Sequence, residues 1–344
     1  MNHHRSRDRI GIMQRSIPIF HSLARVALFL WFACGVMPLL DVEVHAAEIV
    51  VLKSSDVGYY TQAVQGFRQA LPDHAHVVEY TLRDGGTDAR EVGQSIRAGH
   101  PDLVLAVGLN AALAAKLESP DLPVVFCLVL NPELHGLPAG NMTGVLMKIP
   151  HRQQLERIKS VAPRARRIGL LVGAAHNIGA ITTATEQAKS LGLQLIPATV
   201  SNREQVPEAL KRLLPQIDLL WLLPDQMVIS EEFLPFLLES TLDAKIPLFG
   251  FSSTLVQRGA FGALVIDPVE AGQQAGRLAT SLLRTPSNTG MRLVPPDRAH
   301  LALNLNTADY LGFRPPPDII RMASHLFGGP GTFAAKPDRN GLIP

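Results

Sequence analysis

The amino-acid sequence predicts an α/β fold of two Rossmann-like lobes, in which helices cover parallel sheets and a multi-strand hinge joins the lobes. Three observations lead to this prediction. Apolar runs rich in Val, Ile and Leu recur along the chain, and such runs are typical of strands buried on both faces. Amphipathic stretches lie between the runs. The whole series occurs twice, over about residues 48–132 and 166–252.

Eight apolar runs are the predicted strands. They are Ile49–Leu52, Val77–Leu82, Leu103–Val107, Val124–Leu130, Ile168–Val172, Leu193–Val200, Leu219–Leu223 and Ile246–Phe251. Helical spacing of apolar residues predicts a helix from Tyr60 to Leu71 and another from Ile178 to Leu191, where Gly192 suits the C-terminal cap. Asp267–Glu270 reads as a capping box with a proline at the first helical position, and Asp88–Glu91 has the same spacing.

Segments rich in Gly, Pro and Asn mark the expected crossovers between the lobes. The first lies at Asn131–Pro150, and further breaks fall near residues 251–262 and 285–300. Several passages between two lobes imply a hinge with a cleft. We predict an N-terminal lobe of residues 47–140 with part of 253–310, a C-terminal lobe of residues 141–252 with part of 263–285, and a flexible tail at 328–344.

The first residues predict a signal peptide over residues 1–46. Five arginines between Arg5 and Arg25 precede an apolar segment at Val26–Leu40, and the junction Ala46-Ala47 follows. This order is the secretory pattern, so we expect a periplasmic protein. Translation could begin at Met1 or at Met13.

A membrane anchor and a lipid anchor are two other interpretations of this leader. The apolar segment is shorter than the roughly 20 residues that span hydrocarbon, and it contains Gly35 and Pro38. Cys34 follows Trp31-Phe32-Ala33, which faintly resembles a lipoprotein cleavage box, but the apolar run continues beyond this cysteine. Cleavage near Ala46 therefore explains the leader better than either anchor.

Removal of the leader leaves a nearly neutral protein. The whole chain has a formal net charge of +2, and the leader contributes five arginines against Asp8, Asp41 and Glu43. A basic footprint for nucleic acid is therefore missing. Cys127 is then the remaining cysteine, so we expect a buried thiol and no intrachain disulfide.

Five motifs spread over residues 48–325 carry a family resemblance. The most specific is Gly140–Val145, which is close to a "G-N-V-T-G-V" crossover. The others are the strand Pro101–Gly108, Leu122–Phe126 followed by Asn131-Pro132 ("P-V-V-F … D-P"), Arg167–Leu171 at the opening of the second lobe, and Leu303–Gly312 ("N-x-x-T-A-x-x-L-G"). Together they resemble the periplasmic substrate-binding proteins of ABC transporters with the type I periplasmic-binding fold.

The chain departs from the family pattern at the expected ligand loops. Leu109-Asn110 stands where members often have Thr, and Asn131 stands where Asp usually precedes the proline. The loop Gly173–Asn177 replaces a usual Asn-Pro. These departures concern the ligand rather than the fold.

Polar residues follow the predicted strands at their carboxyl ends, where open α/β sheets bind ligands. The candidates are Ser54, Ser55, Asn110 and Asn131 in the first lobe, and His176, Asn177, Asp225 and Ser252 in the second. A carboxylate at Asp225 would pair with an ammonium group, which favours a cationic or zwitterionic ligand. We predict no cofactor and no metal, because the histidines lack metal-ligand spacing.

These candidates also have structural explanations. The two serines are equally suited to cap the first helix, Asn177 is suited to cap a later one, and His176 fits a solvated loop. Trp221 lies in an apolar run and is expected in the core. Tyr59 and Tyr60 lie near a loop and could stack on a ring of the ligand.

The resemblance implies an extracytoplasmic solute-binding protein of an ABC importer. Such a protein closes on a small organic solute, presents it to a membrane permease, works as a monomer and catalyses no reaction. The enzyme motifs G-x-S-x-G, P-loop, H-E-x-x-H and C-x-x-C are absent from the sequence. Two other functions stay open: a periplasmic sensor that docks on a membrane signalling receptor, and a secreted enzyme on the same scaffold.

Overall fold

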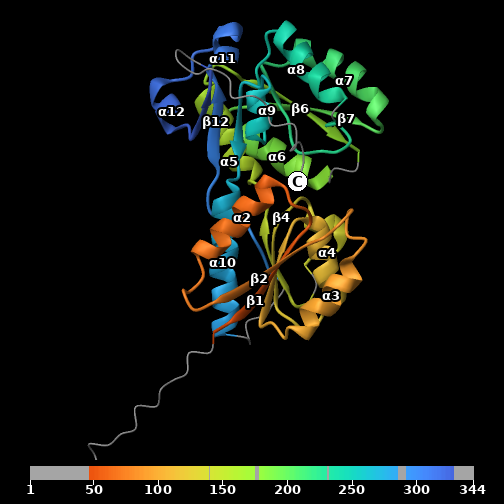
Figure 1. The fold of residues 1–344 in the computed structure, drawn as a ribbon. Coiled ribbons are helices and arrows are strands. Elements are labelled where there is room, and N and C mark those ends of the chain that lie inside the picture. The colour runs from red at the N-terminus through yellow and green to blue at the C-terminus, as the bar shows by residue number, and fades with distance from the viewer. Residues whose placement is uncertain (1–45, 139, 175–177, 231, 286–291, 329–344) are drawn as a thin grey trace, which may run out of the picture. The chain divides into compact units, whose positions relative to one another are not determined.

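The computed structural model describes residues 46–138, 140–174, 178–230, 232–285 and 292–328. Two mostly parallel sheets with helices on both faces form this part of the chain, so the predicted α/β class is confirmed (Figure 1). Nearly all of the predicted leader and tail lie outside the described residues. Within the described ranges, no helix has the length and apolar character needed to cross a membrane.

The first sheet has six parallel strands in the order β11-β5-β4-β3-β1-β2. Their bounds are β1 Glu48–Lys53, β2 His76–Thr81, β3 Leu103–Val107, β4 Val124–Val129, β5 Met142–Leu146 and β11 Arg292–Val294. Helices α2 (Gly58–Gln69) and α10 (Pro268–Arg284) cover one face, and α3 (Ala89–Ala98) and α4 (Leu109–Glu118) cover the other. We call this sheet and its four helices the N-terminal lobe.

The second sheet has seven strands in the order β13-β12-β10-β9-β8-β6-β7, and only the β10–β12 pair is antiparallel within it. The strands are β6 Arg167–Gly173, β7 Gln194–Val200, β8 Leu219–Trp221, β9 Leu248–Gly250, β10 Gly262–Val265, β12 His300–Asn304 and β13 His325–Phe327. We call this sheet and its helices the C-terminal lobe.

Helices cover both faces of the second sheet as well. One face packs against α5 (His151–Val161), α6 (Ile178–Ser190), α11 (Leu305–Leu311) and α12 (Pro317–Met322). The other packs against α7 (Val206–Leu213), α8 (Phe233–Asp243) and α9 (Ser253–Gln257). Short 3-10 turns, η1 (Pro132–His135), η2 (Arg203–Gln205) and η3 (Leu214–Gln216), complete the connections. Trp221 is fully buried in this core, as the sequence predicts.

Helices α2 and α10 cross with their backbones in close approach. A Cβ atom on Gly66 of α2 would collide with the carbonyl of Val269, and one on Gly272 of α10 would collide with the carbonyl of Ala63. Because only glycine permits this approach, α10 packs tightly against the N-terminal lobe although it follows β10 of the C-terminal lobe in sequence.

The strand assignments differ from the expected lobe boundaries at two places. Residues 142–146, expected to open the C-terminal lobe, pair with β4 as β5 of the first sheet. A Cβ atom on Gly144 would collide with the ring of Phe126, so the glycine of the crossover motif serves the packing of β5 on β4. Residues 251–262, expected to be a crossover, instead connect β9 to β10 within the second sheet. The second crossover follows β10, at Ile266-Asp267, and leads into α10, which packs in the N-terminal lobe.

The two predicted capping boxes have different outcomes. Asp267 is the N-cap of α10, and its Oδ1 accepts the N–H of Glu270 at 3.1 Å. Asp88 makes no such bond to α3, because its carboxylate instead accepts the backbone N–H and the Nε–H of Arg83, both at 2.9 Å. The N-cap at Asp267 is therefore confirmed, whereas the second capping-box prediction is wrong.

Candidate functional site

Three predicted residues of the N-terminal lobe gather at one edge of the first sheet. Ser54 follows β1, Asn110 lies in the first turn of α4 after β3, and Asn131 follows β4. Strands β4, β3 and β1 are adjacent and parallel, so their carboxyl ends meet there. Ser55, also predicted, is half-buried beside Ser54.

The hydroxyl of Ser54 caps a helix, but not the one expected. Its Oγ accepts the backbone N–H of Ala111 in α4 at 2.9 Å, whereas α2 has no side-chain N-cap bond. The hydroxyl proton stays available to a ligand. Gly108, at φ +87°, makes room for this arrangement, because a Cβ there would lie 2.6 Å from Oγ of Ser54.

Within the described residues, two backbone donors at the N-terminus of α4 have no acceptor. Ala111 bonds to Ser54 and Ala112 bonds to the carbonyl of Gly108, but the N–H groups of Leu109 and Asn110 have no acceptor in the described part of the chain. Free N–H groups and the helix dipole favour an anion at such a position. This end of α4 is therefore suited to a carboxylate.

Tyr60 adds a hydroxyl to the same edge. Its ring packs against Gly108, where a Cβ would lie 2.7 Å from the tyrosine hydroxyl. Burial, together with the nearby Cys127, raises the pKa of Tyr60, so the group stays protonated and able to donate. Sequence reasoning placed Tyr60 only on the buried face of a helix or as a stacking ring. Helical spacing does not show that its hydroxyl group lies beside Gly108.

Tyr59 has a different role. Its hydroxyl donates to the carbonyl of Ile266 at 3.3 Å, and burial raises its pKa. The ring thus joins α2 to the segment that leads into α10, and its expected role as a stacking ring stays a prediction.

The carboxyl end of β4 has an unusual backbone. Leu128 has φ +56°, and the register of β4 against β5 shifts between Phe126 and Val129, as in a β-bulge. Asn131 follows in the left-handed region at φ +45°, where it precedes η1 with an exposed side chain. Asparagine tolerates this conformation better than leucine does, so the strain is concentrated at Leu128.

A buried lysine supports the loop that carries the two serines. Lys53, 5% exposed, lies 2.7 Å from Asp56 and 2.9 Å from Glu79. Burial opposes its charge, but the two carboxylates outweigh burial and raise the pKa of Lys53. Its hydrogen bond lowers the pKa of Asp56 in turn. Sequence reasoning missed this residue, since Lys53 ends an otherwise apolar run.

The C-terminal lobe has an equivalent edge where β9, β8 and β6 are adjacent. Asp225, after β8, accepts the N–H of Gly173 through Oδ2 and the N–H of Met227 through Oδ1, both at 2.8 Å. Ser252, after β9, caps α9 by accepting the N–H of Leu255 at 3.2 Å. The predicted residues His176 and Asn177 lie outside the described residues.

Asp225 therefore has a structural task as well as its predicted one. Its carboxylate joins the end of β6 to the loop after β8. Binding of an ammonium group to Asp225 stays a prediction.

Cavities of about 350 and 300 Å³ are present among the described residues, and neither of these two is lined by a predicted site residue. The larger one borders Arg157, Arg298 and His300. Among the described residues, no group of three His, Cys, Asp or Glu side chains is arranged to hold a metal. The candidate site therefore consists of two polar edges, one in each lobe.

Comparisons with known sequences find one family over most of the chain. The profile of the family described as ABC transporter substrate binding protein matches residues 49–326. A tyrosine-binding protein of Clostridioides difficile (strain R20291) is 23% identical over 261 residues, which are 72% of this chain and 75% of that protein.

Solved structures share the fold. A substrate binding protein with adhesive properties from Clostridium difficile, in a ligand-free, open structure, superposes with a TM-score of 0.68 at 20% identity over 83% of this chain and 100% of that one. An ABC domain from Streptococcus pneumoniae in complex with L-Trp gives a TM-score of 0.58 at 21% identity, over 82% of this chain and 100% of that one.

Proposed function

The chain belongs to the ABC transporter substrate-binding protein family, and we propose that it captures a small organic solute between its two lobes and delivers the solute to the permease of an ABC importer. The observation that carries this proposal is the pair of polar edges. Each gathers at the carboxyl ends of adjacent parallel strands, and the chain passes between the two sheets three times. A ligand that contacts both edges shifts the population towards a closed conformer, and no covalent step is needed.

We propose an amino acid as the ligand class. The N-terminal edge offers the hydroxyl of Ser54 and the N–H groups of Leu109 and Asn110, which have no acceptor among the described residues, and these donors suit a carboxylate. Asp225 on the other edge suits an ammonium group. A zwitterion has both charges, and two relatives are described with tyrosine or L-Trp.

The ligand class is tested by thermal unfolding of purified residues 47–344, after denaturation and refolding to remove any bound solute. Tyrosine, tryptophan and other amino acids are compared with sugars and organic acids. We expect an amino acid to raise the unfolding midpoint progressively with concentration, by mass action. A shift with a sugar alone would contradict the ligand class, and no shift with any solute would contradict solute capture.

Two variants connect such a shift to the N-terminal edge. Ser55→Ala and Asn110→Ala remove side chains that have no hydrogen bond in the described part of the chain, so both proteins should keep their stability without ligand. We expect them to weaken the ligand-induced shift. Ser95→Ala, on the exposed surface of α3, is the matched control and should leave the shift unchanged.

We further propose that residues 1–46 direct export to the periplasm, which is where an importer's binding protein works. Expression of the full chain in a Gram-negative host, followed by fractionation and N-terminal sequencing, tests this. The expected product is periplasmic and starts at Ala47 or Glu48. Retention of Met1 or Met13 in the cytoplasmic fraction would overturn the assignment.

A further inference from the structure

Side chains fix the backbone of each crossover to one lobe and so show where the chain is free to bend. Gln154 of α5 donates to the carbonyl of Ile149 at 2.8 Å, which fixes the end of the first crossover to the C-terminal lobe. Tyr59 of α2 bonds to the carbonyl of Ile266, just after β10 ends at Val265. Gln274 of α10 donates to the carbonyl of Pro295 in the third crossover, between β11 and β12. Bending of the second crossover is thereby confined to Val265–Ile266.

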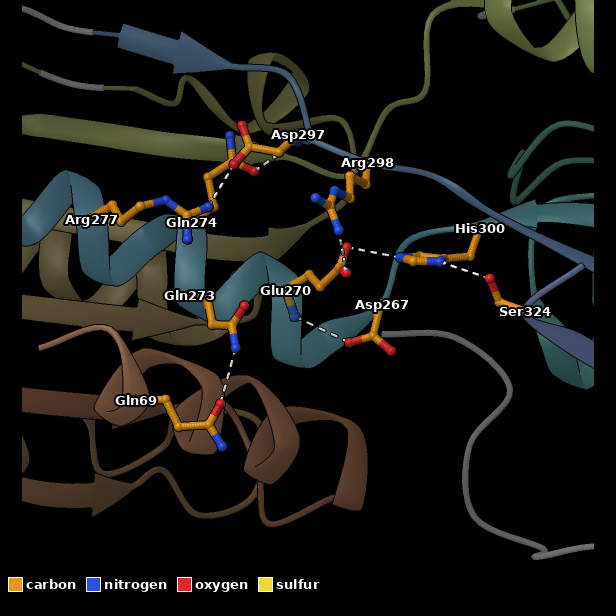
Figure 2. Close-up of polar contacts among 10 residues, drawn as sticks. All are labelled: Gln69, Asp267, Glu270, Gln273, Gln274, Arg277, Asp297, Arg298, His300 and Ser324. Carbon is orange, nitrogen blue, oxygen red and sulfur yellow. Dashed lines mark hydrogen bonds and ion pairs between the residues drawn. The ribbon is translucent and has the colours of Figure 1, made fainter. Parts of the chain in front are cut away.

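The third crossover is held most firmly, along one face of α10 (Figure 2). Gln274, 4% exposed, donates to the carbonyl of Pro295 at 2.8 Å and accepts the N–H of Asp297 at 3.0 Å. Arg277, nearly one turn further along α10, pairs with the carboxylate of Asp297 at 2.5 Å. Residues 295–297 are therefore attached to the N-terminal lobe, while β12 begins at His300 in the C-terminal lobe. The bend is confined to Arg298 and Ala299.

Glu270 of α10 reaches across this bend. Its Oε2 lies 2.8 Å from Nε2 of His300, and the Nδ1 of the same ring lies 3.0 Å from the hydroxyl of Ser324, which precedes β13 (Figure 2). The other carboxylate oxygen of Glu270, Oε1, lies 3.8 Å from the guanidinium of Arg298. Glu270 does not complete the capping box, because its carboxylate is turned towards the C-terminal lobe instead.

The surroundings allow this contact to change when the lobes move. Arg298, Ala299 and His300 line the larger cavity of about 350 Å³, so the bend is not enclosed in a packed core. Helix α10 itself is fixed to α2 by the close approach at Gly66 and Gly272. A rotation at Arg298–Ala299 therefore moves His300 relative to Glu270 without disturbing the helix.

We propose that the Glu270–His300 pair positions the lobes of the unliganded protein and sets how readily they close. This rests on the proposed function, in which capture requires closure. In the conformer that contains the pair, Ser54, Ser55, Asn110 and Asn131 make no hydrogen bond to the described residues of the C-terminal lobe. We assign this conformer, and with it the pair, to the unliganded state, so loss of the pair should favour closure.

The test measures the distance between the edges without any ligand. Spin labels at Glu133→Cys and Gln226→Cys, exposed positions at the two edges, report closure by pulsed electron resonance. Cys127 is fully buried and should not be labelled. We expect Glu270→Ala to raise the share of the short-distance conformer about two- to ten-fold, the range for the loss of one net hydrogen bond. His300→Ala should do the same, and the double variant should add nothing further.

Arg277→Ala is the matched control. It breaks an ion pair of the same helix with the same crossover, but both partners lie on the N-terminal side of the bend, so the distance distribution should not change. Unchanged distances in Glu270→Ala, a shift to longer distances, or an equal shift in Arg277→Ala would overturn the proposal. The distances are measured on unliganded protein. Failure to find a ligand would therefore contradict solute capture but would not change the outcome of the distance measurement.

Discussion

The hydroxyl of Ser54, at the end of β1, accepts the backbone N–H of Ala111 in α4 at 2.9 Å, although the two residues are 57 positions apart. The contact fixes the loop after β1 against the helix after β3, two segments that both belong to the candidate edge. The first two N–H groups of α4 have no acceptor in the part of the chain that the structure describes. One hydroxyl thus serves helix capping and site geometry together.

Replacement of this hydroxyl should cost stability, whereas replacement of its neighbour should not. Ser54→Ala leaves the N–H of Ala111 without an acceptor, and we expect a loss of about 1 kcal/mol in the free energy of unfolding. Ser55→Ala removes no described hydrogen bond and serves as the control. Urea unfolding followed by circular dichroism measures both, and equal midpoints would contradict the capping role.

Gly108 should tolerate no side chain. At φ +87° an alanine is strained, and its Cβ would lie 2.6 Å from Oγ of Ser54 and 2.7 Å from the hydroxyl of Tyr60. We expect Gly108→Ala to destabilise the protein by about 1–3 kcal/mol and to weaken ligand binding. Gly58→Ala is the control, because nothing lies within 4 Å of a Cβ there. Equal unfolding midpoints for the two variants would show that the edge can rearrange.

Asp225 should prove to be needed for stability before ligand binding is considered. Asp225→Ala leaves the N–H groups of Gly173 and Met227 without their acceptor, and we expect a loss of about 1–3 kcal/mol. Asp225→Asn keeps one acceptor oxygen and should lose less. If the Asn variant unfolds near the unsubstituted protein but loses an amino-acid-induced thermal shift, the charge of Asp225 serves the ligand. An Ala variant with unchanged stability would contradict the structural role.

Continuous apolar runs made the central strands predictable, whereas the sheet partners of short strands depend on packing that a sequence does not show. All eight predicted runs overlap a strand, from β1 to β9 with β5 excepted. Residues 142–146 were expected in the other lobe because their glycine and polar flanks resemble a crossover. The ring of Phe126 over Gly144 and the pairing with β4 and β11 place them in the first sheet as β5.

The candidate site was predictable by position but not by role. The carboxyl ends of strands identify Ser54, Asn110 and Asn131 in one lobe and Asp225 and Ser252 in the other. Which helix a serine caps, or which backbone a carboxylate holds, depends on contacts over 50 residues away, such as Ser54 with Ala111 and Asp225 with Gly173. The polar contacts of α10 were equally hidden, since the capping-box spacing assigns Glu270 to its own helix.

The pH dependence of stability should be visible at Asp218, at the opposite end of the second sheet. Its Oδ2 accepts the backbone N–H groups of Arg166 and Arg167 at 2.9 and 2.8 Å, and its Oδ1 lies 2.6 Å from the guanidinium of Arg167. Burial opposes the charge, but these bonds outweigh burial and lower the pKa of Asp218 below its usual value. A carboxyl with a lowered pKa adds stability above its unfolded pKa of about 4, and that stability is lost as the pH falls through the folded value.

Asp218→Asn should therefore lower the free energy of unfolding by about 1–3 kcal/mol at pH 7 and by progressively less below about pH 4, where the unsubstituted carboxyl also becomes neutral. Urea midpoints at pH 7, 5 and 3.5 measure the difference between the two proteins. Asp56→Asn is the control, because Asp56 pairs with Lys53 but its side chain is 78% exposed, so solvent screens the pair and the loss at pH 7 should be smaller. The difference in the free energy of unfolding between Asp218→Asn and the unsubstituted protein could instead stay constant down to pH 3.5. That result would mean that the charge of Asp218 does not contribute to stability.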